Sequence, residues 1–176
     1  MIPVAVMTSI AALQTQVVAN FMGSAEPFIK FMIMNIVPAS QNSFSAAIDL
    51  LKKNNLPTED LDPGKQLFVV EEGNEVVATV AVEYDYNSAL LRSLSVAEEK
   101  RGSGIGKELV DFVEDYINKQ GVQTIYLLTT TAADFFRKRG YQIIDRSAVP
   151  QFIQDTREYS VLCASSSTLM KKELSL

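Results

Sequence analysis

Three glycines at alternate positions, Gly102, Gly104 and Gly106, restrict the fold of this chain more than any other feature. They follow a strand-like run that ends at Val96, and they overlap the start of a segment, residues 105–117, whose apolar side chains recur at helical spacing. Glycine lets the backbone approach a phosphate group closely, and the first N–H groups of a helix carry a partial positive charge. The pattern predicts a strand–loop–helix unit that holds an anion at the start of the helix.

Two common phosphate-binding motifs do not fit these glycines. A P-loop needs G-x-x-x-x-G-K-[ST], but Arg101 stands five residues before Gly106, and Glu108 follows Lys107. A Rossmann G-x-G-x-x-G that starts at Gly102 would need a glycine where Lys107 stands. Nucleotide triphosphatases and dinucleotide-dependent enzymes are therefore disfavoured.

Strand and helix signals alternate along the rest of the chain, and no proline interrupts them between Pro63 and Pro150. Strands are predicted at residues 31–37, 67–70, 76–83, 89–96, 124–128, 141–144 and 169–174. Helices are predicted from Ser40 or Ser43 to about residue 54, at 105–117, and through Lys138 with Thr131 and Asp134 as a capping box. This order predicts a single α/β domain.

Composition removes several classes of function. A formal charge of -5 argues against nucleic acid as a partner, and the absence of histidine excludes Ser-His-Asp and Cys-His catalysis. The single cysteine, Cys163, excludes an intramolecular disulfide and a cysteine-cluster zinc site, so we expect no metal and a cytoplasmic location. Acid–base chemistry must come from carboxylates, other polar groups, water or the substrate.

Residues 1–31 differ from the remainder, because their charged residues are Glu26 and Lys30 alone. Polar residues interrupt their apolar runs, which disfavours a transmembrane span, and no basic segment of a signal peptide precedes Ile10. We interpret them as an amphipathic or poorly ordered extension, with translation upstream of a natural start at Met32 or Met34 and membrane association as open alternatives. The folded domain is then residues 32–176.

Residues 101–106 read R-G-S-G-I-G and fit the pattern [RQ]-x-x-G-x-[GA], which resembles the signature of the GCN5-related N-acetyltransferases, the GNAT superfamily. Residues 133–141, A-D-F-F-R-K-R-G-Y, look like the second motif of that family. Residues 91–94 and 156–163 are similar to the arsenic-resistance N-acetyltransferase branch, which is related to amino-acid N-acetyltransferases. The resemblance implies an acyl-CoA N-acyltransferase fold: a mixed, mainly antiparallel central sheet flanked by helices and splayed between strands 90–96 and 124–128.

The resemblance also implies acetyl-CoA as co-substrate, with its pyrophosphate on the glycine loop and its pantetheine arm along the preceding strand. The implied binding residues are Leu94, Ser95, Val96, Arg101, Gly102, Ser103, Gly104, Ile105, Gly106 and Lys107. The implied reaction is direct acetyl transfer, in a ternary complex, to a primary amine of a small amino acid or an analogue such as an arsenical or a phosphinothricin-like compound. A protein or peptide amine, a CoA-sensing module without turnover, and a homodimer stay open.

Several side chains are candidates for the chemistry. Glu83 ends an apolar strand and is the predicted base for the acceptor ammonium, with a solvent-facing strand end as the alternative. Arg92 interrupts an apolar strand, so we expect it to pair with an internal carboxylate such as Glu83 or with a substrate carboxylate. Arg157 is a second candidate clamp or a surface charge, and Cys163 is a substrate contact or a small buried hydrophobe. Phe136 stands where many relatives have a tyrosine that protonates the leaving thiolate.

Overall fold

The computed structural model describes residues 34–63, 65–162 and 166–174. The Cα positions divide the chain into two compact units, Met1–Asn35 and Ile36–Leu176, and the second unit contains the elements described below. The predicted extension, residues 1–31, and Cys163 lie outside the described residues. Within the described ranges, no helix has the length and apolar character that a membrane span requires.

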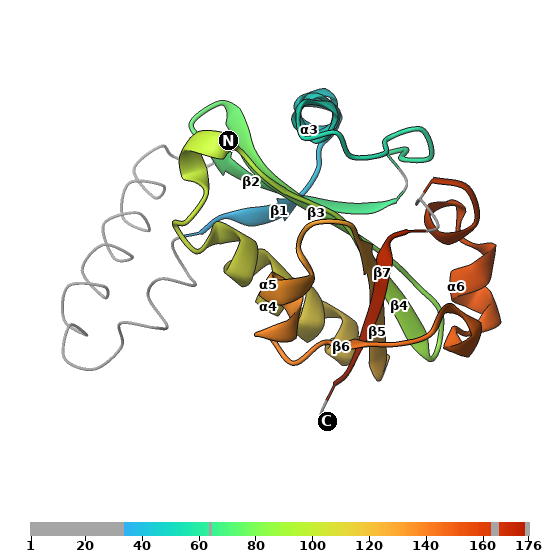
Figure 1. Ribbon diagram of the computed structural model, residues 1–176. Helices are drawn as coiled ribbons and strands as arrows, with labels where there is room; N and C mark the ends of the chain where they lie inside the picture. The colour runs from blue at the N-terminus through green and yellow to red at the C-terminus, as the bar shows by residue number, and fades with distance from the viewer. Residues whose placement is uncertain (1–33, 64, 163–165, 175–176) are drawn as a thin grey trace, which may run out of the picture. The chain divides into compact units, whose positions relative to one another are not determined.

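The described part of the second unit is built on one seven-stranded sheet with the order β1-β2-β3-β4-β5-β7-β6 (Figure 1). The strands are β1 (Ile36–Pro38), β2 (Gln66–Glu72), β3 (Glu75–Tyr84), β4 (Ser88–Val96), β5 (Thr124–Thr129), β6 (Gln142–Ile143) and β7 (Thr168–Glu173). Neighbouring strands pair antiparallel except β4 and β5, which are parallel. The predicted mixed, mainly antiparallel sheet is confirmed.

Helices cover both faces of this sheet (Figure 1). They are α3 (Gln41–Lys53), α4 (Ile105–Lys119), α5 (Ala133–Arg137) and α6 (Gln151–Asp155), with 3-10 turns at Glu98–Lys100 and Arg146–Ala148 and a π-helical turn, η3, at Glu158–Leu162. Successive residues of β2 point to opposite faces. Leu67 and Val69 pack in a cluster with Ala47 of α3, whereas the ring of Phe68 lies 4.9 Å from that of Phe112 of α4. The alternation of β2 thus separates two apolar layers.

Local signals placed most element boundaries correctly. Ser40, rather than Ser43, is the N-cap of α3: its hydroxyl accepts the N–H of Ser43, and the Ser43 hydroxyl accepts the N–H of Ser40. The hairpin, the helix after the glycines and the strand at Thr124 lie where they were predicted.

Three predicted boundaries were wrong. The strand predicted at 31–37 begins, among the described residues, only at Ile36 and runs to Pro38. Thr131 and Asp134 form no capping box, since α5 begins after Ala132, whose N–H is taken instead by the hydroxyl of Thr129 at 2.9 Å. The strand predicted at 141–144 is only Gln142–Ile143, because the Tyr141 ring turns into the core, where its centroid lies 5.3 Å from that of Phe136. Thr129 accepts the N–H of Ala132 within one local turn, whereas Tyr141 leaves its strand for packing in the core.

Strands β4 and β5 separate after three paired residues. Their pairing runs from Ser88 with Thr124 to Leu90 with Tyr126 and then stops, which is the splay that the resemblance implies. Beyond it, a bulge shifts the register between β3 and β4, so that Ser93 adopts a left-handed backbone with φ 53° and its carbonyl accepts the hydroxyl of Thr79 at 2.8 Å. The sheet therefore opens between two of its central strands.

Candidate active site

The opening between β4 and β5 holds a cleft with two adjoining parts. The first, here called the inner cavity, has a volume of about 310 Å³ and lies between residues 91–94 of β4 and residues 127–129 of β5. The second, the outer groove, has a volume of about 670 Å³ and lies beside the glycine loop. The two share five lining residues: Asn55, Leu56, Leu94, Thr131 and Ala132. A ligand held in the outer groove can thus reach into the inner cavity.

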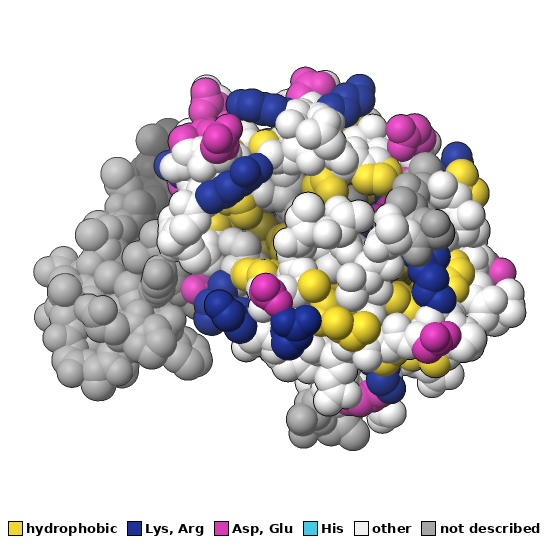
Figure 2. Space-filling model, in the orientation of Figure 1, with side chains coloured by type: hydrophobic (Ala, Val, Ile, Leu, Met, Phe, Trp, Pro, Cys, Tyr) yellow, Lys and Arg dark blue, Asp and Glu magenta, His cyan; other side chains and the backbone are white. Residues whose placement is uncertain are grey.

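The outer groove contains half of the residues predicted to bind the coenzyme. These are Leu94, Ser95, Val96, Arg101 and Gly106. Gly102, Ser103, Gly104, Ile105 and Lys107 do not line it: the Ile105 side chain is buried in the core, and Lys107 pairs with Asp111 at 2.7 Å. The space-filling view shows charges of both signs interspersed on the drawn face, with apolar side chains in the hollows between them (Figure 2).

The glycine loop has the geometry that an anion site at a helix start requires. Gly104 is the N-cap of the 15-residue helix α4 with φ 95°, and no side chain caps the first turn. A Cβ on Gly106 would lie 3.6 Å from Val96 and 3.9 Å from Phe135, both of which line the outer groove. At Gly106 the chain therefore presents backbone, rather than a side chain, to a ligand in this groove, and the uncapped start of α4 fits the phosphates of a coenzyme.

Asn54 connects three elements at the outer groove, a role that its sequence position does not reveal. It is the C-cap of α3, its amide donates to the hydroxyl of Ser95 at 2.6 Å, and its carbonyl oxygen accepts from Arg101. The Arg101 side chain also donates to the carbonyl of Val96 at 3.2 Å. Asn54 thereby holds the end of α3 and the glycine loop against β4.

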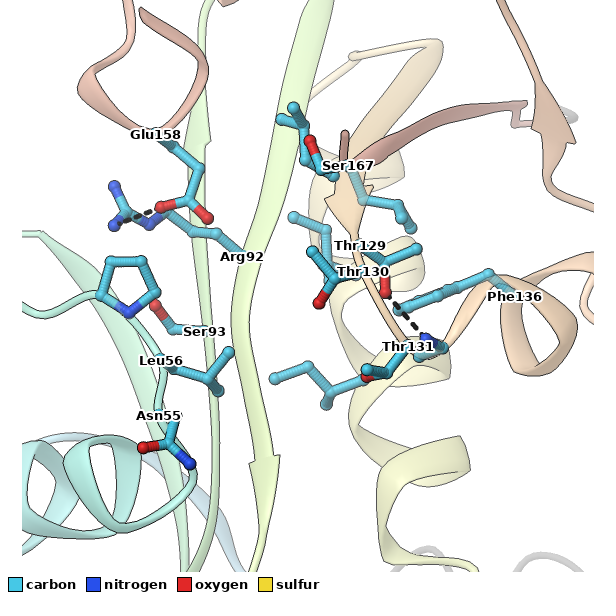
Figure 3. Close-up of a pocket in the computed structure, with 16 residues that line it drawn as sticks. Asn55, Leu56, Arg92, Ser93, Thr129, Thr130, Thr131, Phe136, Glu158 and Ser167 are labelled. Atoms are coloured by element: carbon cyan, nitrogen blue, oxygen red, sulfur yellow. Dashed lines mark hydrogen bonds and ion pairs between the residues drawn. The ribbon is translucent and has the colours of Figure 1, made fainter. Parts of the chain in front are cut away.

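The inner cavity has an ionic wall and a hydroxyl-bearing wall (Figure 3). Arg92, Ser93 and Glu158 lie on the β4 side, and the opposite side carries Thr129, Thr130, Thr131, Phe136 and Ser167. The buried ring of Phe136 packs edge-to-face on Phe135, with centroids 5.0 Å apart. No tyrosine is among the described residues that line this cavity, so the chain has no phenol at the position that Phe136 takes.

Arg92, whose side chain is 1% exposed, is the centre of a cluster of five charged side chains. Its Nη2 lies 2.7 Å from Asp60 and 2.8 Å from Glu158, and its Nη1 contacts Asp60 and lies 2.7 Å from Glu83. Lys65 adds a second cation, 3.2 Å from both Asp60 and Glu83. Arg92 was expected to pair with an internal carboxylate such as Glu83 or with a substrate carboxylate, and the structure shows the pair with Glu83.

These contacts keep Asp60 and Arg92 ionised. Burial by itself would raise the pKa of Asp60, but hydrogen bonds and charges from Arg92 and Lys65 outweigh it and lower that pKa to about 2. Burial would likewise lower the pKa of Arg92, but the hydrogen bond that it donates to Asp60, the charge of Glu158 and the hydrogen bond that it donates to Glu83 raise that pKa instead. Arg92 is therefore a permanent cation with its charge already balanced.

The other predicted residues lie at different distances from the cavity. The Glu83 side chain is 21% exposed and contacts Arg92 and Lys65, but Glu83 lines neither part of the cleft. Arg157 is exposed and outside both linings, whereas its neighbour Glu158 lines the inner cavity. The base and clamp roles of Glu83, Arg92 and Arg157 stay predictions.

Sequence reasoning missed Asp60, Lys65 and Glu158. Asp60 lies in the polar segment 57–64, whose composition is that of an ordinary loop, and Lys65 follows it directly. Glu158 is the residue after Arg157, and nothing in its sequence position marks it. The one usable signal was Arg92 itself, since a charge within an apolar strand requires buried partners of opposite sign. That rule predicts the partners' charge and not their positions.

Comparisons with known proteins agree with this fold. The model of the acetyltransferase (GNAT) domain matches residues 63–143. An uncharacterized N-acetyltransferase of Chlorobaculum tepidum is 34% identical over 90 residues, which are 51% of this chain and 57% of that protein. The amino-acid acetyltransferase of Pseudomonas fluorescens is 35% identical over 80 residues, 44% of this chain and 18% of that protein.

Solved structures show the same fold. N-acetylglutamate synthase from Neisseria gonorrhoeae, complexed with coenzyme A and N-acetyl-glutamate, superposes with a TM-score of 0.71 at 14% identity, over 82% of this chain and 36% of that one. A splayed mixed sheet with a glycine loop before its central helix defines an α/β protein of the acyltransferase type. Residues 63–143, just under half of the chain, match the GNAT domain, and the described fold is that of the GNAT acyltransferases. The chain spans just over half of the first relative and about a fifth of the second.

Proposed function

We propose that this protein transfers an acetyl group from acetyl-CoA to a primary amine in the inner cavity. The observation that carries the proposal is the continuity of the cleft: a groove at the uncapped start of α4 adjoins a cavity with a charged wall through five shared residues. Such a cleft brings a phosphate-bearing donor and a small polar acceptor together. The GNAT relatives named as acetyltransferases support this activity.

The donor would be held by the backbone at the start of α4 and along the end of β4, with Arg101 at the mouth of the groove. Bound acetyl-CoA supplies a thioester carbonyl that an amine can attack. Arg101 and Asn54 align this mouth, since they connect α3, β4 and the glycine loop. Direct attack in a ternary complex needs no nucleophile from the protein.

The protein's own task is to remove a proton from the acceptor ammonium. An amine is protonated near neutral pH, and only its neutral form has a lone pair for attack. The carboxylates around Arg92 are the groups of this chain suited to the task, and Glu83 is the one that the sequence predicts as the base. The leaving thiolate has a pKa near that of a free thiol, about 8.5, so water can protonate it without a phenol at Phe136.

A small amino acid or amino-acid analogue is the proposed acceptor. The inner cavity, about 310 Å³, is at the small end of ligand sites, which run from roughly 300 to 1,000 Å³. Relatives named amino-acid acetyltransferases support the same class. The particular acceptor, including an arsenical or a phosphinothricin-like compound, a cytoplasmic location and the oligomeric state stay predictions.

Thiol release by the purified full chain tests the activity. Acetyl-CoA would be supplied with L-glutamate, phosphinothricin and a peptide pool in separate reactions. We expect release with one of the small amino acids and none with the peptides. Release with peptides alone would refute the small acceptor, and coenzyme binding without release in any reaction would indicate a CoA-sensing module.

A further inference from the structure

Glu158 is the acidic residue that lines the inner cavity, among the described residues. Its side chain is 9% exposed and lies 2.8 Å from Nη2 of Arg92. Figure 3 shows it beside Arg92 on the wall opposite Thr129 and Thr130. Asp60 and Glu83 contact the same guanidinium, but neither lines the cavity. An acceptor in this space meets Glu158 before it meets any other carboxylate of the cluster.

The turn that carries Glu158 is held on both sides. Thr156 is buried: its hydroxyl donates to the carbonyl of Ile153 at 2.7 Å and accepts the N–H of Tyr159 at 3.3 Å. The phenol of Tyr159 donates to the carbonyl of Arg146 at 3.0 Å. Ile153 is itself fully buried in a core cluster that includes Leu90 and Tyr126. Glu158 is thus presented to the inner cavity from a packed turn.

The charge of the cluster suits an ammonium ligand. Asp60, Glu83 and Glu158 supply three negative charges, and Arg92 and Lys65 supply two positive ones, which leaves one negative charge when all five are ionised. Because Arg92 is balanced by internal carboxylates, an acceptor carboxylate would have to displace one of them. An ammonium group needs no such displacement.

We infer that Glu158 is the catalytic base that receives the proton of the acceptor ammonium, directly or through one water. This inference rests on the proposed acetyl transfer. The ammonium gives one proton to Glu158, and the neutral nitrogen then forms its bond to the acetyl carbonyl carbon while the carbon–sulfur bond breaks. A second proton passes from that nitrogen to the departing thiolate, by way of water, and Glu158 returns its proton to solvent.

The test compares Glu158→Gln, Glu158→Asp and wild type in pH profiles of kcat/KM for the accepted amine. Glu158→Gln is expected to lose about 100-fold near pH 7, and the loss shrinks as the pH rises through the pKa of the amine. Glu158→Asp keeps the carboxylate but places it one methylene further from the acceptor. Its kcat/KM is expected to be at least about tenfold higher than that of Glu158→Gln. A purely structural partner of Arg92 would instead lower kcat/KM by the same factor at every pH.

Two further variants sharpen the comparison. Glu173→Gln removes a carboxylate from the exposed end of β7 and is expected to match wild type. Glu83→Gln is expected to keep the wild-type shape of the pH profile. If Glu83→Gln shows the loss that shrinks at high pH and Glu158→Gln does not, the inference is overturned and Glu83 is the base. Thermal unfolding would check that each variant is folded. We expect the Glu83 and Glu158 variants to fold because Arg92 keeps two of its three carboxylates in each.

A binding measurement separates this inference from the proposed function. Phosphinothricin and L-glutamate would be titrated calorimetrically into wild type and Glu158→Gln, each saturated with CoA. We expect the variant to bind the amine at least about tenfold more weakly, with its affinity for CoA within twofold of wild type. If wild type binds CoA but transfers no acetyl group, the proposed function fails. Equal amine affinities in the two proteins, or binding by neither, overturn the assignment of Glu158.

Discussion

The substitution Asp60→Asn tests how the charged cluster is held together. The Asp60 side chain is 2% exposed and contacts both terminal nitrogens of Arg92, and its Oδ2 also lies 3.2 Å from Lys65. An amide of the same shape keeps one acceptor oxygen and replaces the other by an NH₂ group that faces a cation. Arg92 would retain Glu83 and Glu158. We expect a destabilised but folded protein.

The size of the effect follows from the pKa of Asp60. That pKa falls from 3.8 to about 2 on folding, so the ionised carboxylate stabilises the fold by about 2 kcal/mol at neutral pH, at about 1.4 kcal/mol per unit. Because the folded pKa is the lower one, this contribution is complete above about pH 5, falls to about half near pH 3, and is lost below about pH 2. In a domain of this size, 2 kcal/mol corresponds to a fall in Tm of roughly 5 °C.

Urea unfolding of wild type and Asp60→Asn at a series of pH values from 7 to 2.5 measures this difference. Asp115→Asn, at an exposed position of α4, is the matched control and is expected to stay within about 0.5 kcal/mol of wild type. The difference for Asp60→Asn should shrink steadily as the pH falls from 5 to 3. A difference that is the same at pH 7 and pH 3 would show that packing, and not the charge of Asp60, holds the cluster.

Three further predictions concern the cleft. Gly104→Val is expected to weaken CoA binding at least about tenfold by calorimetry. The control is Gly121→Val, which has a similar positive φ of 82° but lies away from the groove and should keep wild-type affinity. Equal effects of the two variants would show that no anion binds at the start of α4. Phe136→Tyr should change kcat by less than about tenfold, and a larger rise would show that thiolate protonation limits the rate. Arg157→Ala should raise the KM of the acceptor more than that of acetyl-CoA in steady-state kinetics, and equal changes would assign Arg157 to the surface.

Prediction from the sequence succeeded where one element contains its own signal. The capping box of α3 needs only Ser40 and Ser43. The spacing of apolar residues and the glycines before them predict the helix α4. The short elements after β5 were predicted less well. The Thr129 hydroxyl accepts the N–H of Ala132 in a local turn before α5. Tyr141 leaves its strand for the core, because tertiary contacts outweigh the weak preference of a short strand.

In the candidate site, too, prediction succeeded for residues that are close together in the sequence. Leu94, Ser95, Val96, Arg101 and Gly106 could be predicted to lie together at one groove because the strand, loop and helix that carry them are contiguous in the chain.

The order of strands and helices, the glycine loop and the need for a partner to Arg92 were determined by the sequence itself, because periodicity, backbone freedom and charge are local properties. Only the tertiary structure decided that Asp60 and Glu158 join Glu83 at one guanidinium and that Glu158 alone of these lines the cavity. The physical reason is the separation of β4 from β5 after Leu90, which opens the sheet and lets a loop before β2 and a turn before β7 converge on Arg92. The residue pattern within each of these segments does not depend on such a distant contact, so the contact cannot be predicted from that pattern.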